Sequence, residues 1–468
     1  MSRPSDTGPG PKPAGYTTST ALKRQFSGLF LAAPWFDRAG LWMLRRAFFP
    51  VSRAWAAAGV AGGDHERFYA AVPMPRRFED DARLTKALAR YEAARAASTA
   101  IDDLWERTFF GSADAPEPRR RAIEGARLAH AHAFNLTRRQ FAFLLPRGLP
   151  RIDLAVSTPT ETEAIYGPAR TDLAPYLADP GSSWPVETSQ RIPGAVGIDY
   201  WLRFKSPSKR LGDTVHARVH EPIGVKDPPT IILGHGVCVE FDHWIGLVDE
   251  ADALCAAGFR VVRPEAPFHG WRCPDGAYGG ERLIGSFPLG ALDAFTGAIQ
   301  EWAVLAHWAR ATSKGRIAFG GTSLGALIAQ LAADRAREWP AELRPDGLLL
   351  ITHSGSMHQT VLDGEITRLF ASAEAAIAKG WTAETMDSYF SLLDPRRGPV
   401  VPPERIVSIL GRRDSVTPYD GGKPLVERWG VPAENLFELD RGHFSVPMTL
   451  IRNHAPVRRF CEVMGVTR

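Results

Sequence analysis

From about residue 194 to its end, the sequence alternates short apolar runs with segments of helical pattern. The first two runs, IDYWLRFKSPS and TVHARVHEP, predict a pair of strands near a turn. Six more follow: TIILGHG, FRVVRPEAP, RIAFGGTS, DGLLLITHS, RIVSILGRRD and NLFELDRGHFS. Five of these precede predicted helices, near 244–257, 289–311, from Leu324 onward, 421–429 and 448–464, and DGLLLITHS precedes an insertion near 357–398. Such alternation predicts an α/β fold, with a mostly parallel, doubly wound sheet covered by helices on both faces.

The first 193 residues differ in texture. Residues 1–20 are polar and rich in Pro, Gly, Ser and Thr, which predicts a disordered tail. Residues 21–150 have helical periodicity and predict a helical N-terminal region. The apolar side chains that share a predicted face are Leu41, Leu44 and Phe48 in one segment and Leu84, Leu88 and Tyr91 in another. Residues 151–193 lack a clear period and predict a linker or irregular wrap, which leaves 194–468 for the α/β domain.

Composition argues against several classes of protein. The chain of 468 residues has 56 Lys and Arg against 52 Asp and Glu, and its arginines are scattered, so we expect no nucleic-acid partner. Its four cysteines form no cluster of zinc spacing, and so few cysteines in so long a chain indicate a reducing compartment. The sequence has neither a signal-peptide pattern nor an apolar run of about 18 residues, and we expect a cytoplasmic protein without a spanning helix.

One short motif, GTSLG at 321–325, has the G-x-S-x-G pattern, in which a serine stands between two glycines. The chain has 43 glycines, so the motif has little weight alone. Its context adds weight, because Ser323, Asp414 and His443 each follow a predicted strand. The carboxyl ends of parallel strands meet at one edge of a sheet, and we expect these three side chains to meet there. Ser, then Asp, then His is also the chain order of the alpha/beta-hydrolase triad.

The residue types at these positions predict nucleophilic catalysis. Gly321 and Gly325 leave room for a tight strand-to-helix turn, and the N-terminus of the following helix favours a developing negative charge. In such a site His443 accepts the proton of Ser323, and Asp414 orients the imidazole and stabilises its charged form.

An oxyanion hole for this chemistry needs two backbone donors. The N–H of Leu324, directly after the serine, is the first. The second is predicted in the loop ILGHGVCVEFDHW, where we expect the N–H of Val237.

The sequence resembles the alpha/beta-hydrolase superfamily over roughly 195–468. The resemblance is carried by GHG at 234–236, GTSLG at 321–325, GRRDSVTP around Asp414 and RGHFS around His443. It implies a sheet of about eight strands, a Ser-His-Asp triad, no required cofactor and a cap after the sixth strand, where 357–398 lies. A narrower similarity, to a little-characterised branch related to lipid deacylases, is carried by PEAPFHGWRCP at 264–274 and LRRAFFPVSRAW at 44–55. It suggests an acyl-lipid substrate.

Four more polar residues border the predicted site and leave alternatives open. His235, Glu265, His269 and Arg272 either shape loops by hydrogen bonding, which we favour, or form a substrate rim. Arg272 in particular would pair with Glu265 or with an anionic group of a substrate.

Several other aspartates and histidines are candidates for roles in or near the site. Asp420 and Asp440 are the alternatives to Asp414 as the acid, although Asp440 is close to His443 along the strand. Asp242 and His243 are expected to cap the helix after the third strand. The two histidines that we expect not to bind a metal together, because positions i and i+2 of a helix face apart, are His130 and His132.

The stretch 38–58 interleaves arginines with aromatic residues. A membrane-surface helix has this pattern, which gives one alternative of peripheral membrane contact through 38–58. The other, which we favour, is a helix packed on the catalytic domain with its arginines in water.

Together these observations predict a serine hydrolase that cleaves a carboxylic ester through an acyl-enzyme, with no metal and no cofactor. Its partner is a small-molecule or lipid ester. Two alternatives share the fold: an acyltransferase with the same triad, and a noncatalytic scaffold or lipid-binding protein.

Overall fold

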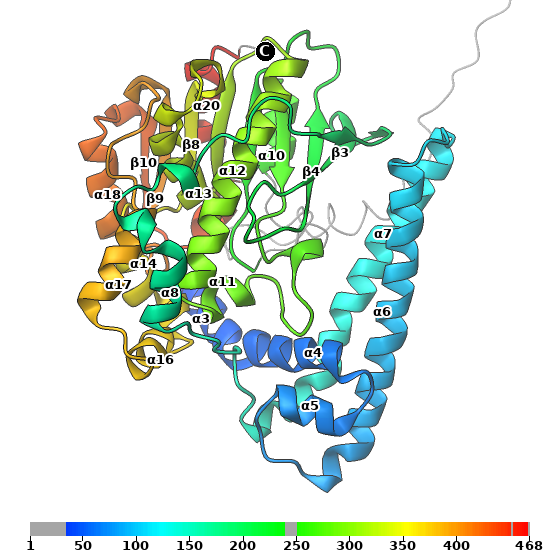
Figure 1. The fold of residues 1–468 in the computed structure, drawn as a ribbon. Helices are drawn as coiled ribbons and strands as arrows, with labels where there is room; N and C mark the ends of the chain where they lie inside the picture. Colours follow the sequence, from blue (N-terminus) through cyan, green and yellow to red (C-terminus); the bar gives the residue numbers. More distant parts are fainter. Residues whose placement is uncertain (1–33, 239–249, 451–452, 467–468) are drawn as a thin grey trace, which may run out of the picture.

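The computed structural model describes residues 34–238, 250–450 and 453–466. A central sheet has helices on both faces, and helices from the start of the chain lie beside and below it (Figure 1). The predicted tail at 1–20 lies outside the described residues, as do Asp242 and His243.

The strands of the described residues form one sheet, in the order β1-β3-β4-β6-β5-β7-β8-β9-β10, with β2 also paired to β3. The pairs β3–β4 and β4–β6 are antiparallel, and each pair from β6 through β5, β7, β8 and β9 to β10 is parallel. The strands are β1 (Glu187–Thr188), β2 (Ile192–Pro193), β3 (Ile198–Lys205), β4 (Thr214–Glu221), β5 (Thr230–Gly234), β6 (Arg260–Pro264), β7 (Ile317–Thr322), β8 (Gly347–Ile351), β9 (Ile406–Gly411) and β10 (Leu436–Leu439). The eight longer strands, β3 to β10, confirm the predicted mostly parallel sheet.

Helices follow the strands in the chain, as the alternation predicts. They are α10 (Glu250–Ala257), α11 (Glu281–Gly285), α12 (Leu289–Thr312), α13 (Leu324–Arg335), α18 (Tyr419–Arg428), α19 (Ser445–Leu450) and α20 (Ala455–Val463). The single last helix predicted near 448–464 is wrong, because α19 and α20 are separate. Pro456 stands in the first turn of α20, where a proline is tolerated, but it could not continue a helix from α19.

The apolar residues of the parallel strands bury both faces of the sheet. Ile232 and Phe319 pack in one cluster with α12 and α13, and their neighbours Ile231 and Ala318 pack in another with α10 and α20. Successive side chains of a strand point to opposite faces, so a strand that is apolar throughout needs a cover on each.

An insertion of short helices separates β8 from β9. It contains α14 (Met357–Leu362), α15 (Glu365–Arg368), α16 (Ser372–Ala378) and α17 (Ala383–Phe390). Counted from β3, β8 is the sixth strand, so these helices lie where the sequence predicts a cap.

The segment before the sheet is partly regular. Residues 151–193, predicted as a linker or irregular wrap, contain α8 (Pro159–Tyr166), two 3-10 turns and the short strands β1 and β2. The Trp381 indole N–H of the cap donates to the Ser157 carbonyl at 2.6 Å, so this segment holds the cap against the domain.

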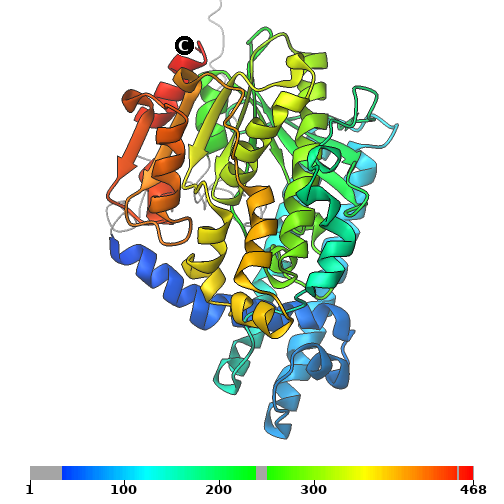
Figure 2. The ribbon, with the colours of Figure 1, turned by 60° about the vertical axis from the view of Figure 1, so that its left-hand side comes forward.

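Residues 34–147 are mostly helical. They form α3 (Pro34–Met43), a π-helical turn η1 (Leu44–Phe48), α4 (Phe49–Ala61), α5 (His65–Ala71), α6 (Asp81–Phe109), α7 (Glu117–Leu136) and the 3-10 segment η3 (Thr137–Arg147). The α6–α7 pair stands beside the β3 edge of the sheet (Figure 1), where Trp105 and Trp201 lie with ring centroids 5.1 Å apart. α3 and α4 pass beneath the sheet and the cap (Figure 2).

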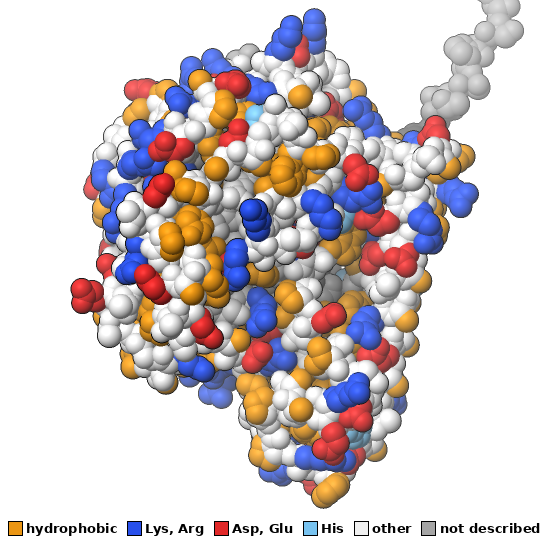
Figure 3. Space-filling view, viewed as in Figure 1, with side chains coloured by type: hydrophobic (Ala, Val, Ile, Leu, Met, Phe, Trp, Pro, Cys, Tyr) orange, Lys and Arg blue, Asp and Glu red, His pale blue; other side chains and the backbone are white. Residues whose placement is uncertain are grey.

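Residues 49–58, the second half of the stretch 38–58, are buried, whereas residues 38–48 are exposed or half-buried. α4 is buried over nearly its whole length. Arg53, which we expected in water, is instead buried in an ion pair with Glu281, with 2.9 Å between Nη1 and Oε2. Arg38, Arg45 and Arg46 are exposed. No helix within the described ranges combines the length and the apolar character needed to cross a membrane. Positive and negative side chains are interspersed on the face that Figure 3 shows.

Candidate active site

Ser323 occupies the corner between β7 and α13. Its backbone has φ 56° and ψ −117°, which costs a non-glycine residue on the order of 1–3 kcal/mol. The flanking glycines permit the corner. A Cβ on Gly321 would lie 2.5 Å from the backbone of Gly325, and one on Gly325 would lie 2.2 Å from that of Gly234. β5, β7 and α13 therefore approach too closely for any side chain, and the hydroxyl of Ser323 faces the loops after β9 and β10.

The structure brings Ser323, His443 and Asp414 together. The Oγ of Ser323 lies 2.9 Å from Nε2 of His443, and Nδ1 of His443 lies 2.8 Å from Oδ2 of Asp414. A carboxylate only accepts hydrogen bonds, so Nδ1 carries the imidazole proton and Nε2 is free to accept the serine proton. All three residues are less than 10% exposed, which strengthens these hydrogen bonds by excluding water.

Four hydrogen bonds fix the carboxylate of Asp414. Its Oδ1 accepts the backbone N–H groups of Val416 and Thr417, each at 2.9 Å. Its Oδ2 accepts the hydroxyl of Thr417 at 3.0 Å as well as the proton of His443. The orientation of the carboxylate, and through it that of the imidazole, is set by the loop after β9.

The two other candidate acids lie away from the histidine. Asp420 is exposed on α18. Asp440 forms an exposed pair with Arg413, with 2.6 Å between Oδ1 and Nε. Neither contacts the imidazole of His443.

The two predicted oxyanion donors border Ser323. Leu324 is the first residue of α13, and the first N–H groups of a helix have no acceptor within it. Val237 lines the same cavity as Ser323. The next donor along each segment is engaged: Gly325 N–H donates to the carbonyl of His235 at 2.9 Å, and Cys238 N–H donates to Nε2 of His269 at 3.0 Å.

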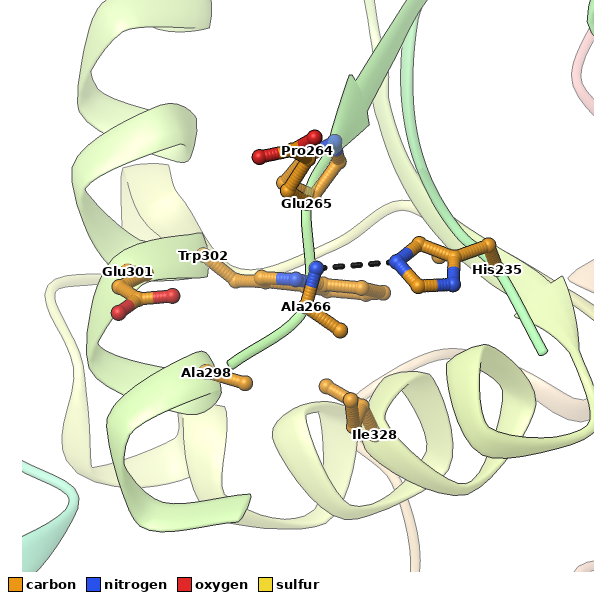
Figure 4. Close-up of a pocket in the computed structure, with 9 residues that line it drawn as sticks. His235, Pro264, Glu265, Ala266, Ala298, Glu301, Trp302 and Ile328 are labelled. Carbon is orange, nitrogen blue, oxygen red and sulfur yellow. Dashed lines mark hydrogen bonds between the residues drawn. The ribbon is translucent and has the colours of Figure 1, made fainter. Parts of the chain in front are cut away.

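His235 and His269 lie behind this loop and hold it in place. Nε2 of His235 accepts the backbone N–H of Ala266 at 3.0 Å, the dashed line in Figure 4, and its Nδ1 donates to the carbonyl of Gly236. Nδ1 of His269 donates to the carbonyl of Pro267 at 2.9 Å. Complete burial, with a contribution from His269, lowers the pKa of His235 well below its usual value, so this ring stays neutral.

Arg272 is buried in a network of charges rather than open to a substrate. It donates to Glu301 and Asp213, at distances of 2.7 to 2.9 Å. Its partner in Glu265 is the backbone carbonyl at 2.9 Å, not the carboxylate that the sequence suggested. The Glu265 carboxylate instead accepts the N–H of Trp271 at 3.2 Å.

The four predicted rim residues, His235, Glu265, His269 and Arg272, do not line the cavity that holds Ser323. Glu265, Glu301 and His235 surround a separate cavity of about 10 Å³, shown in Figure 4, which is too small for a substrate.

A cavity of about 80 Å³ opens beside Ser323. An apolar cavity of about 150 Å³ holds one benzene ring, so this cavity has room for roughly three or four non-hydrogen atoms. Its walls are almost entirely apolar and come from α11 and the segment that leads into α12, from α12 and α13, from the cap, and from the loops after β5 and β9. They include Leu283, Ile284, Phe287, Phe295, Leu327, Met357, Val361, Ile366 and Val416.

Two residues that support the site, Thr417 and Asp37, are not among those predicted from the sequence. The first had a local signal, because a threonine three residues after an aspartate commonly closes a turn with it. Asp37 had none, because its partners, Phe444 and Ser445, lie some four hundred residues further along the chain.

Within the described ranges, no group of three or more His, Cys, Asp or Glu side chains is arranged to hold a metal ion. His130 and His132 are both exposed on α7. The four cysteines, all among the described residues, form no disulfide bond with one another.

Comparison with known proteins gives structural neighbours alone. No protein-family model and no curated protein matches the sequence. Acetyl xylan esterase 1 from Thermoanaerobacterium sp. is 14% identical over 63% of this chain and 94% of its own, with a TM-score of 0.42. An S-formylglutathione hydrolase from Agrobacterium tumefaciens is 16% identical over 59% and 99%, with a TM-score of 0.40. A cold-adapted esterase from an Arctic intertidal metagenomic library is 15% identical over 61% and 100%, with a TM-score of 0.39.

The fold can be assigned from the chain's own topology. Its eight main strands form a mostly parallel sheet, the serine corner follows the fifth of them, and the loops of Asp414 and His443 follow the seventh and eighth. A strained serine on a strand-to-helix turn, followed in the chain by an aspartate and a histidine, is typical of one fold. The chain has the alpha/beta-hydrolase fold.

Proposed function

We propose that the protein is a serine hydrolase that cleaves carboxylic esters, with Ser323 as nucleophile, His443 as general base and acid, and Asp414 as the group that orients His443. The observation that supports this most is the unbroken hydrogen-bond chain from the Ser323 hydroxyl through both nitrogens of His443 to the Asp414 carboxylate. Each link has the length and the donor direction that proton transfer to the imidazole needs.

The proposed reaction has two halves. Ser323 Oγ attacks the ester carbonyl while its proton passes to Nε2 of His443, and the tetrahedral intermediate collapses as His443 returns that proton to the leaving alkoxide. An acyl-enzyme and an alcohol result. A water molecule then attacks the acyl-enzyme, gives one proton to His443 and releases the acid, and the proton returns to Ser323. The charged imidazole of both halves is stabilised by Asp414.

The oxyanion of each tetrahedral intermediate is proposed to lie between the N–H groups of Leu324 and Val237. Loss of one such donor typically slows an enzyme about 10²- to 10³-fold. Backbone donors cannot be removed by substituting a side chain, but His269 holds Cys238, the neighbour of Val237, through its N–H. Replacing that imidazole should loosen the donor loop and lower kcat.

The apolar cavity supports an acyl chain as the part of the substrate that is buried. A chain of roughly three or four non-hydrogen atoms would fill it, on the scale in which about 150 Å³ holds the six carbons of benzene. Each buried methylene contributes about 0.8 kcal/mol, so kcat/KM should rise about fourfold per carbon until the cavity is full.

The substrate class can be tested with p-nitrophenyl esters from acetate to palmitate. The optimum is expected between propionate and hexanoate. Leu283→Ala, which enlarges the cavity wall, should move the optimum to longer chains, and Leu283→Trp should move it to shorter ones. Ile377→Ala is the matched control, because Ile377 is 62% exposed on the cap and lines no part of this cavity. An optimum that none of these variants moves would refute the acyl-pocket assignment.

Catalysis itself is tested with Ser323→Ala, which should abolish turnover of the best ester while leaving the fold intact. Ser388→Ala on α17, whose hydroxyl donates only to the nearby Thr385 carbonyl, is the control and should retain full turnover. Turnover that survives in Ser323→Ala would exclude Ser323 as the nucleophile.

A further inference from the structure

The first described helix of the chain holds the loop that carries His443. Asp37 of α3 accepts the backbone N–H groups of Phe444 and Ser445, at 2.7 and 3.2 Å, and the hydroxyl of Ser445 at 2.5 Å. Phe444 directly follows His443, and α19 begins at Ser445. The carboxylate of Asp37 thus satisfies the first donors of α19 from a helix that lies outside the α/β domain.

α3 and the His443 loop are in close contact. A Cβ on Gly442 would lie 2.5 Å from the carboxyl carbon of Asp37, and one on Gly40 would lie 3.5 Å from the ring of Phe444. Gly442 and Phe444 flank His443 on either side. α3 therefore contacts both chain neighbours of the imidazole, and a shift of this helix would be transmitted to the ring.

α3 and η1 are also anchored where the Asp414 loop is anchored. Leu41 and Leu44 pack against the same apolar cluster as Phe444, and this cluster contains Val416. Val416 donates its N–H to Asp414. The loops that carry two members of the candidate triad therefore share one support, which comes from the N-terminal region.

We propose that Asp37 is a positioning residue, which holds the His443 loop so that the imidazole reaches Ser323 and Asp414 at once. The proposal rests on the function proposed above and gives a role to α3. Hydrogen bonds to a charged acceptor are stronger than those between neutral groups, and a carboxylate can accept all three bonds at this point. Without them, the loop keeps its internal hydrogen bond from Gly442 to Ser445 and the packing of Phe444. A misplacement of about 1 Å can cost about 10²-fold in rate.

The test compares Asp37→Ala and Asp37→Asn with a matched control. Asp64→Ala removes another aspartate cap of the N-terminal region, whose Oδ1 accepts the N–H of Arg67 at 2.8 Å at the start of α5. Asp37→Ala is expected to lower kcat roughly 10- to 100-fold with KM within about twofold of the wild type, because substrate binding is intact and chemistry is not. The kcat of Asp37→Asn should lie between those of the wild type and Asp37→Ala, because asparagine keeps one acceptor oxygen for the two N–H groups. Asp64→Ala should match the wild type in both constants.

Labelling of Ser323 by a fluorophosphonate probe adds a readout independent of the substrate. Its rate should fall in Asp37→Ala in proportion to kcat, while far-UV circular dichroism stays that of the wild type. If the wild-type protein is not labelled at all, the proposed function fails. If the wild type is labelled and Asp37→Ala is labelled equally fast, the function stands and the role of Asp37 is refuted.

A folding defect in Asp37→Ala would not end the test. Ser445→Ala removes the hydroxyl that Asp37 accepts, from the other side of the contact, and with it the acceptor of the Gly442 N–H at 3.1 Å. It should lower kcat and the labelling rate in the same sense, and less than Asp37→Ala. Rates equal to the wild type in both Ser445→Ala and Asp37→Asn would refute the proposal.

Discussion

Replacing Asp414 with asparagine should move the imidazole proton of His443 from Nδ1 to Nε2. Oδ1 of the wild-type carboxylate accepts two backbone N–H groups, from Val416 and Thr417. An asparagine must keep its only oxygen at that place, since an amide N–H₂ there would face two donors. Its nitrogen then points at Nδ1 of His443, where Oδ2 now lies 2.8 Å away. The amide can only donate, so the imidazole proton moves to Nε2, which faces Ser323 and can no longer accept its proton.

The expected loss is large because the wrong tautomer stops the base. The same substitution in a serine protease lowers kcat about 10⁴-fold without moving the residues, and about 10⁴-fold corresponds to about 5.4 kcal/mol of activation free energy. The effect on KM should be small, since Asp414 does not line the cavity beside Ser323.

The assay is ester hydrolysis by Asp414→Asn, with Asp440→Asn as control because the exposed carboxylate of Asp440 pairs with Arg413, away from His443. The control should hydrolyse at the wild-type rate. A kcat for Asp414→Asn within about tenfold of the wild type would refute the argument from the tautomer. A dead Asp420→Asn beside an active Asp414→Asn would show that the wrong acid had been chosen.

Two further predictions concern stability. Gly325→Ala should destabilise the protein by about 3 kcal/mol or more in urea unfolding, because its Cβ would lie 2.2 Å from the backbone of Gly234. The control Gly125→Ala, on an open part of α7, should instead stabilise the protein by about 0.4–1 kcal/mol. Equal changes in the free energy of unfolding of the two variants would refute the close-packing argument. Burial lowers the pKa of His353 from 6.5 to about 3, so the unfolded chain binds one more proton in that window, and stability is full above pH 6.5 and lost as the pH falls. The free energy of unfolding of the wild type should therefore fall more steeply than that of His353→Asn, by about 1.4 kcal/mol per pH unit, and parallel curves would exclude the buried neutral histidine.

The sheet and the catalytic candidates were predictable because their signals are local. Apolar runs such as TIILG and GLLLI need a cover on both faces whatever the rest of the chain does, and they alternate with helices. The glycines around Ser323 are readable for the same reason, since the close approach of backbone around it admits no side chain. The order of Ser323, Asp414 and His443 then follows from the order of the strands.

The contacts between distant parts of the chain were not predictable from one sequence. Nothing near Asp37 indicates that it caps a helix that starts at Ser445. Arg53 sits in a basic, aromatic stretch that is typical of a membrane surface, yet Glu281 neutralises it inside the protein. For Arg272 the sequence left Glu265 and an anionic substrate group as alternatives, because the buried carboxylate of Glu301, with which it pairs, lies in another segment. In each case, burial paired the charge with a residue far away in sequence.

The dimensions of the cavity were hidden for a related reason. Its walls come from several distant segments, including Leu283 on α11, Leu327 on α13 and Met357 in the cap. Each is an ordinary apolar residue in the sequence, and only their meeting beside Ser323 makes an apolar pocket. The acyl length that we propose for the site is thus set by packing rather than by a motif.

The most direct test of the central claim is labelling with a fluorophosphonate probe followed by peptide mass mapping, because the probe reacts readily only with an activated serine. We predict one covalent adduct on Ser323 in the wild type, no adduct in Ser323→Ala, and much slower labelling in His443→Ala, where the serine has lost its base. A folded wild-type protein that stays unlabelled, or an adduct on another serine, would contradict the assignment of Ser323 as the nucleophile.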